Sequence, residues 1–169
     1  MVLTKEELIS ALKTEVRILL HLAAKATAQQ LDYRPSPEQR SLLELLQYLS
    51  ILGPIHLGAI KAGSIEMKAF GQTWNKEQAV AKTLDLEQAL QAISKLADLF
   101  TMEIGNFSAE DLRSEIELFG RKAPRGVMLV NLVLSHYTAY RMQLFLYLKA
   151  SGHAELNTMN LWVGIDGAM

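Results

Sequence analysis

Apolar residues recur every three or four positions through most of this 169-residue chain, and each run follows a helix start signal. Thr4 and Glu7 have the spacing of a capping box, in which two side chains bond the free backbone N–H groups of a helix start. One apolar stripe follows: Leu8, Leu12, Val16, Leu19, Ala23 and Ala26. Such a stripe must be buried against other elements. It predicts a first helix from about residue 5 to Leu31.

Three further helices are predicted by the same signals. Ser36, followed by a proline and then Gln39, predicts the start of a second helix that spans about 38–62. Pro54 is expected to kink or divide that helix, because proline removes one helical hydrogen bond. Capping residues and periodicity predict a third helix over about 85–103 and a fourth over about 125–152.

The connections between these helices indicate the architecture. Residues 63–83 are of mixed polarity and predict a long crossover between the second and third helices, in place of a tight hairpin. Residues 115–119 are expected to be briefly extended, and other strand signals are nearly absent. The pattern predicts one all-α domain over 1–169, a four-helix bundle. The tail, residues 160–166, is apolar enough to pack on the bundle or on a second subunit.

Composition excludes several classes of function. The chain has no cysteine, which rules out disulfides, thiolate nucleophiles and cysteine-ligated metals. Its net charge of -1 gives no bias toward nucleic acid or anionic membranes. The start lacks a signal-peptide pattern, so a cytoplasmic location is expected. His136, Arg141 and Gln143 would be costly in lipid, so the apolar fourth helix is interpreted as a buried bundle helix.

The candidate functional residues centre on the fourth helix. His136 lies on its apolar stripe, and Tyr140 follows one turn later on the same face. Tyr48 lies at the border of the apolar stripe of the second helix. A buried histidine without a hydrogen-bond partner costs roughly 1–3 kcal/mol, so His136 needs a partner. His56 is expected to reach either the same region or the end of the bundle, and Gln143 is placed to hydrogen-bond into that region.

Three interpretations of this set remain open. Tyr48, His136 and Tyr140 form a polar network that fixes helix register, or line a small-molecule pocket, or hold a divalent metal. The sequence identifies no catalytic residue. Arg141 is expected either to pair with Glu44 or to be solvated.

Two segments resemble the DinB-like family of helical bundles, also described as DinB/YfiT-like metalloenzymes. Residues 34–49 are similar to the second helix of that family. His136-Tyr-Thr-Ala-Tyr-Arg-Met-Gln-Leu is similar to its His-x-x-x-His-Arg-Gly-Gln-Leu pattern. The resemblance implies an up-down-down-up bundle, often dimeric, with a three-histidine site for nickel, zinc or a similar ion. It also implies thiol-dependent transferase or isomerase chemistry. Of that triad only His136 is kept, because Tyr48 and Tyr140 stand at the other two positions.

The favoured hypothesis is a DinB-like bundle that has lost this metal site and acts as a small-ligand-binding or structural homodimer without a resident cofactor. The alternative is a divergent metal-dependent enzyme, a thiol-dependent transferase or hydrolase. It would use nickel, zinc or iron with His136, Tyr48 and Tyr140. A third hypothesis is an interaction module that contacts another protein through an apolar surface on the first helix or through the apolar tail around Trp162. His21 and His153 are interpreted as solvent-exposed.

Overall fold

The computed structural model describes residues 3–167, and most of them are helical, as predicted. The elements in chain order are α1 (Lys5–Ala23), η1 (Ala28–Gln30), α2 (Leu42–Ala62), α3 (Met67–Ala81), α4 (Leu86–Ser94), α5 (Leu96–Gly105), α6 (Ala109–Arg113), β1 (Glu115–Leu118), β2 (Arg121–Pro124), α7 (Arg125–Leu129), η2 (Val130–Leu134), α8 (Ser135–Ala150) and η3 (Met159–Val163).

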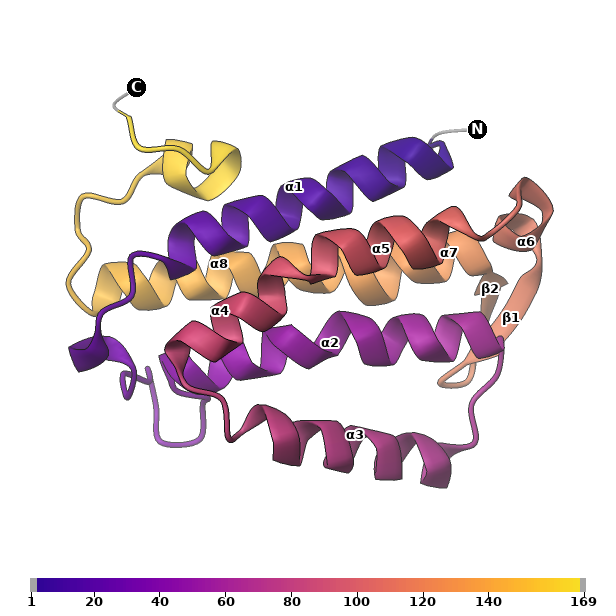
Figure 1. Ribbon diagram of the computed structural model, residues 1–169, viewed down its shortest axis with the longest axis horizontal. Coiled ribbons are helices and arrows are strands. Elements are labelled where there is room, and N and C mark those ends of the chain that lie inside the picture. The colour runs from indigo at the N-terminus through magenta and orange to yellow at the C-terminus, as the bar shows by residue number, and fades with distance from the viewer. Residues whose placement is uncertain (1–2, 168–169) are drawn as a thin grey trace.

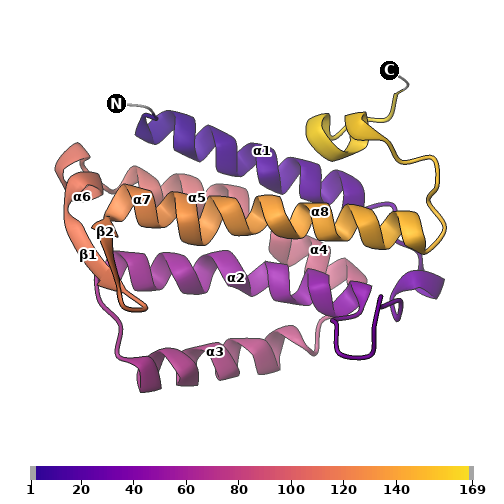
Figure 2. The same cartoon turned by 180° about the vertical axis from the view of Figure 1, so that it is seen from behind.

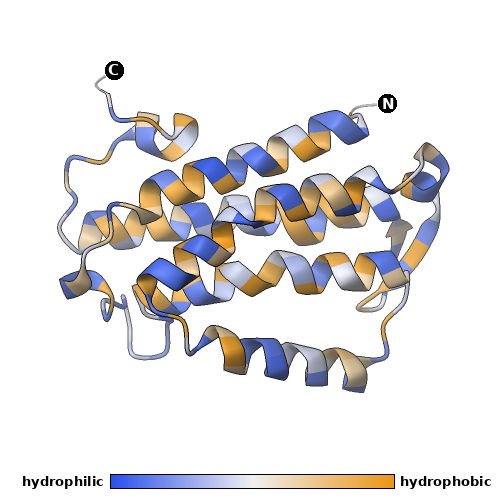
Figure 3. Ribbon diagram, in the orientation of Figure 1, coloured by the Kyte–Doolittle hydropathy of each residue, from blue (hydrophilic) through white to orange (hydrophobic). Residues whose placement is uncertain are grey.

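The long helices pack side by side around one core. Helix α1 packs against α4, α5 and α8, and α2 packs against α3, α4 and α8. Both views of the ribbon show α3 as the outermost helix, along α2 and on the side away from α1 (Figures 1 and 2). Hydrophilic and hydrophobic residues alternate along α1 and α3, as expected for helices with one solvated face (Figure 3).

The start of α1 confirms the capping prediction. The Thr4 backbone N–H donates to the Glu7 carboxylate at 2.7 Å, and the Glu7 N–H donates to the Thr4 hydroxyl at 3.1 Å. The same reciprocal pair, Asp85 with Gln88, begins α4. The predicted third helix is divided at Lys95 into α4 and α5.

Two predicted boundaries were wrong. Helix α1 ends at Ala23, because the chain tightens into a turn and then into η1, where the buried Gln30 side chain accepts from the Thr27 N–H at 3.0 Å. Helix α2 begins at Leu42, not near residue 38, because Ser41 and Glu44 form its capping box. Arg34 pairs with that same Glu44, at 3.4 Å.

Residues 63–83 were predicted to be only a long connection between two helices. That prediction was wrong, because they contain the 15-residue helix α3. The carboxylate of Glu66 caps this helix by accepting from the Lys68 and Ala69 N–H groups. Ala81 is the only residue of α3 that is fully buried. Two half-buried aromatic residues, Phe70 and Trp74, add to its packing on the core. Helix α3 is therefore a lightly anchored cover on α2.

A two-stranded antiparallel hairpin, β1 with β2, occupies the stretch where only brief extension was predicted. Its turn contains Phe119, whose φ of 53° is in the left-handed region, followed by Gly120 at 71°. The Phe119 side chain remains 42% exposed. The hairpin leads directly into α7, and so it fixes where the last long helical stretch begins.

Pro54 does not divide α2, which continues through it. The Tyr137 hydroxyl accepts from the Gly53 N–H at 3.1 Å and donates to the Leu49 carbonyl at 3.0 Å. In a regular helix these two backbone groups would bond each other. The Tyr137 side chain on α8 therefore provides the hydrogen-bond partners of two α2 backbone groups close to Pro54. Helix α2 is apolar and long enough to cross a membrane, but 67% of its most apolar window is buried inside the protein.

The fourth predicted helix is continuous but not uniform. Between α7 and α8 the segment η2 is π-helical, and His136 follows it by two residues. A π-helical turn changes the direction of the side chains that follow, and such turns occur frequently at functional sites.

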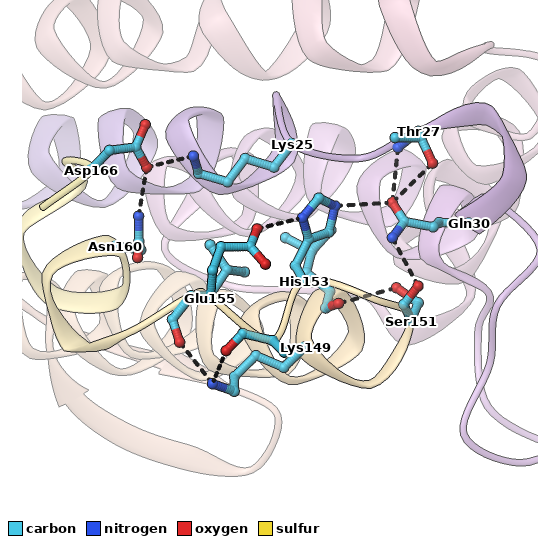
Figure 4. Close-up of polar contacts among 12 residues, drawn as sticks. Lys25, Thr27, Gln30, Lys149, Ser151, His153, Glu155, Asn160 and Asp166 are labelled. Atoms are coloured by element: carbon cyan, nitrogen blue, oxygen red, sulfur yellow. Dashed lines mark hydrogen bonds and ion pairs between the residues drawn. The ribbon is translucent and has the colours of Figure 1, made fainter. Parts of the chain in front are cut away.

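The tail packs on α1, as predicted, and a polar network holds it there (Figure 4). The Asp166 carboxylate accepts from Lys25 at 2.5 Å and from Asn160 at 2.8 Å. The interpretation of His21 and His153 as solvent-exposed was wrong. Asn160 lies 3.2 Å from one ring nitrogen of His21, and the His153 ring bridges Glu155 and Gln30. The tail still exposes Trp162, Val163 and Ile165. Homodimerisation through these side chains stays a prediction.

Candidate functional site

Four of the five predicted pocket residues lie together between α2 and α8. Tyr48 and Tyr140 have ring centroids 5.0 Å apart, and His56 and His136 have centroids 5.2 Å apart. The His136 and Tyr140 rings, 6.4 Å apart, join the two pairs. We call Tyr48, His56, His136 and Tyr140 the His–Tyr cluster.

Gln143, the fifth predicted residue, is directed away from the imidazoles. Its amide donates to the Tyr147 hydroxyl at 2.7 Å, and that hydroxyl donates to the Arg40 carbonyl at 3.1 Å. Gln143 therefore supports the loop before α2.

Three aromatic side chains that sequence reasoning did not assign to the site surround His56. Phe70 and Trp74 of α3 have ring centroids 6.3 and 6.1 Å from the His56 ring, and Phe119 of the hairpin turn lies at 6.1 Å. Trp74 also contacts Tyr48, with centroids 5.8 Å apart. Helix α3 and the hairpin turn therefore cover the cluster with half-buried or exposed aromatic rings.

The tautomer of His56 follows from its backbone contact. Its Nδ1 lies 2.9 Å from the Leu52 carbonyl, which can only accept, so Nδ1 carries the hydrogen. Burial lowers the pKa of His56, and the neighbouring His136 lowers it further, against the opposing effect of the Leu52 carbonyl. The neutral ring then presents Nε2 as an acceptor.

The imidazole of His136 lies in an unfavourable environment for a polar side chain. Its Nδ1 is buried and has no hydrogen-bond partner in the described part of the chain. A buried polar atom without a partner costs roughly 1–3 kcal/mol. His136 therefore makes the fold less stable than an apolar ring of the same size would.

The three-histidine metal site that the resemblance implies does not fit these side chains. Burial raises the pKa of Tyr48, and the hydroxyl of Tyr140, 3.4 Å away, raises it further. Tyr48 therefore stays a neutral phenol, which is a weak ligand for a divalent ion. Within residues 3–167 no three histidine, cysteine or carboxylate side chains are grouped as a metal site requires.

Two hollows lie along the seam between α2 and α3, and Ile51 lines both of them. A groove of about 520 Å³ includes Pro54, Gly58 and Phe70. A smaller hollow of about 280 Å³ includes Arg40 and Tyr48. The second hollow therefore shares Tyr48 with the His–Tyr cluster.

Arg141, which was expected to be solvated or paired with Glu44, is buried on the other side of α8. Its guanidinium lies 3.2 Å from the carboxylate of Glu15 on α1. The Trp162 ring of the tail covers it, with the guanidinium carbon 4.9 Å from the ring centroid. Both predicted environments were wrong, and Arg141 belongs to the core and not to the His–Tyr cluster.

The stability of the protein is expected to fall on acidification because of His56. The unfolded imidazole charges near its ordinary pKa of 6.5, whereas the folded one charges only at lower pH. Its contribution is therefore complete above pH 6.5 and is lost as the pH falls toward the folded pKa, by at most about 1.4 kcal/mol per pH unit. Urea unfolding at about pH 7.5 and 5.5 measures this loss. The non-titrating variant His56→Gln should show a smaller one, and an equal loss in both proteins would contradict the assignment.

Comparison with known proteins supports the fold. No family model and no curated protein matches the sequence. A DinB-like protein from Bacillus subtilis, YjoA, is 21% identical, with a TM-score of 0.66 over 89% of this chain and 94% of its own. A DinB-like protein from Bacillus cereus is 16% identical, with a TM-score of 0.70 over 90% and 95% of the two chains. The predicted resemblance is confirmed at the level of the fold: this chain has the fold of the DinB-like proteins.

Proposed function

We propose that this chain is a cytoplasmic DinB-like four-helix bundle of the up-down-down-up kind that binds a small aromatic organic molecule at the His–Tyr cluster. It does so without the three-histidine metal site. The observation that carries the proposal is the buried Nδ1 of His136, which has no partner in the described protein. A bound molecule with one hydrogen-bonding group would supply that partner.

The surroundings of His136 favour an aromatic molecule. The neighbouring side chains present ring faces and edges, two neutral phenols and the acceptor nitrogen of His56. Such walls with a few polar groups are typical of small-molecule sites. Charged ligands would have no counter-charge among the four cluster residues themselves.

The cover over the cluster is suited to admitting a ligand. Helix α3 buries only Ala81 completely, and two hollows are lined by residues of both α3 and α2. Elements with few buried apolar contacts open at low free energy. The ring of an aromatic ligand would take the place of the Trp74 or Phe70 ring against the cluster. The apolar area in contact with the cluster would therefore change little.

Replacing His136 with phenylalanine tests the proposal, because it separates stability from binding. We expect the variant to be more stable than the wild type by about 1 kcal/mol, since the unpartnered nitrogen is removed. We expect it also to lose binding of phenylacetamide, a neutral aromatic amide, in ligand-detected NMR. Urea unfolding supplies the free energy.

His153→Phe is the matched control, because the His153 ring has partners at both nitrogens. It should lose stability and keep phenylacetamide binding. A His136→Phe protein that is less stable than the wild type and still binds the amide would show that His136 is a structural side chain, and the proposal would fail.

A further inference from the structure

The smaller hollow at the α2–α3 seam has a different chemistry from the cluster it adjoins. Its lining combines the loop before α2, the first turns of α2 and the last turn of α3. Most of the lining residues carry basic or amide side chains: Arg34, Gln39, Arg40, Gln47, Gln78 and Lys82. Its volume of about 280 Å³ is enough for a small organic group.

Arg40 is the distinctive residue of this hollow. Its guanidinium carbon lies 3.9 Å from the centroid of the Tyr48 ring. In the described part of the chain no carboxylate pairs with this guanidinium, and its N–H groups make no hydrogen bond. Meanwhile the Tyr147 hydroxyl holds the Arg40 carbonyl at 3.1 Å. A half-buried guanidinium is thus held over Tyr48 with its five donors free for a ligand.

The charges around the hollow favour one negative charge. Arg34 and Glu44 form an ion pair at 3.4 Å and balance each other. Arg40 and Lys82 remain, against the exposed Glu38, which leaves a net charge of about one positive unit. The hollow also lies at the start of the 21-residue helix α2, whose dipole adds partial positive charge there.

We propose that the hollow binds the carboxylate of an aromatic monocarboxylic acid, with Arg40 as its anchor and with the ring of the acid directed past Tyr48 into the His–Tyr cluster. The planar guanidinium fork matches a carboxylate with two parallel hydrogen bonds. Tyr48 belongs to both the hollow and the cluster, so an acid that carries a second hydrogen-bonding group on its ring can contact Arg40 and supply the partner of His136 Nδ1 together. This inference rests on the proposed function and names the class of ligand.

Phenylacetate and phenylacetamide are a matched pair of probes, since they differ only in the charged group. We expect phenylacetate to bind the intact protein about tenfold more tightly, because hydrogen bonds between a guanidinium and a carboxylate are stronger than those to a neutral amide. Arg40→Gln should remove that advantage and leave phenylacetamide binding within about twofold. Arg40→Lys, which keeps the charge and loses the fork, should fall between them. Titrations followed by protein NMR also report whether each variant is folded.

Arg121→Gln is the control, because Arg121 is exposed on β2, outside the lining of the hollow. It should bind both probes as the wild type does. Equal binding of the two probes, or an Arg40→Gln variant that keeps the preference for phenylacetate, would overturn this inference and leave the proposed function in place. Tighter binding of phenyl phosphate would overturn the monocarboxylate assignment. Binding of none of these probes would overturn both proposals.

Discussion

Replacing Gly53 with alanine is expected to destabilise the protein by about 2–4 kcal/mol, because the new methyl group has no space. A Cβ at this position would lie 2.6 Å from the Tyr137 hydroxyl and 2.7 Å from the end of the Phe100 ring. Both rings are fully buried in the core. Displacing Tyr137 would also break its two hydrogen bonds to the α2 backbone. Urea unfolding measures the loss.

Gly58 on the same helix is the matched control. A Cβ there meets no atom within 4 Å, so Gly58→Ala should stabilise the protein by about 0.5–1 kcal/mol through helix propensity. If Gly53→Ala were as stable as Gly58→Ala, the position of Tyr137 between the two backbone groups of α2 would be wrong.

Removing one charge from the pair Glu15–Arg141 is expected to have the other large effect. The two side chains are only 12% and 4% exposed, and burial raises the pKa of Glu15 even with Arg141 beside it. Glu15→Leu leaves the guanidinium buried without its counter-charge, which costs about 3–5 kcal/mol. Chemical denaturation of the variant would give the value.

The double variant Glu15→Leu with Arg141→Met should recover most of that loss, because an apolar pair needs no counter-charge. Part of the loss would remain, since Trp162 would no longer contact a guanidinium. A double variant no more stable than Glu15→Leu alone would contradict this account, because the unpaired guanidinium would then not be the cause of the loss.

The sequence could predict those parts of the fold that depend on residues close together in the chain. The capping boxes at Thr4 and Asp85 form because each involves residues only three positions apart. The start of α2 was predicted from a box at Ser36, whereas the helix begins at a second box, formed by Ser41 and Glu44. The second forms, because the Leu42 and Leu43 N–H groups bond carbonyls of residues 33 and 31, and periodicity along one helix does not report such contacts.

Helix α3 was missed because its buried face is small. Its sequence is polar apart from Phe70, Trp74 and a few small or exposed residues, so no continuous stripe marked it. For the same reason, the sequence did not predict that α3 covers the candidate site. The partner of Arg141 was missed for another reason: Glu15 and Glu44 are both on neighbouring helices, and only their arrangement in space selects one.

The candidate site was partly visible in the sequence. The spacing of His136 and Tyr140 placed them on one face, and the structure brings Tyr48 to them. His56 follows Tyr48 by eight residues, about two helical turns, so the two side chains lie on the same side of α2. Phe119 carries no such signal, because a hairpin turn determines its position.

Native mass spectrometry of untagged protein, purified from its own cells without a metal-affinity step, tests the central claim most directly. The account predicts an organic adduct at one copy per chain that is absent from the His136→Phe variant. One equivalent of nickel, zinc or iron bound to the wild type and lost in that variant would contradict it, because the His–Tyr cluster would then be a metal site.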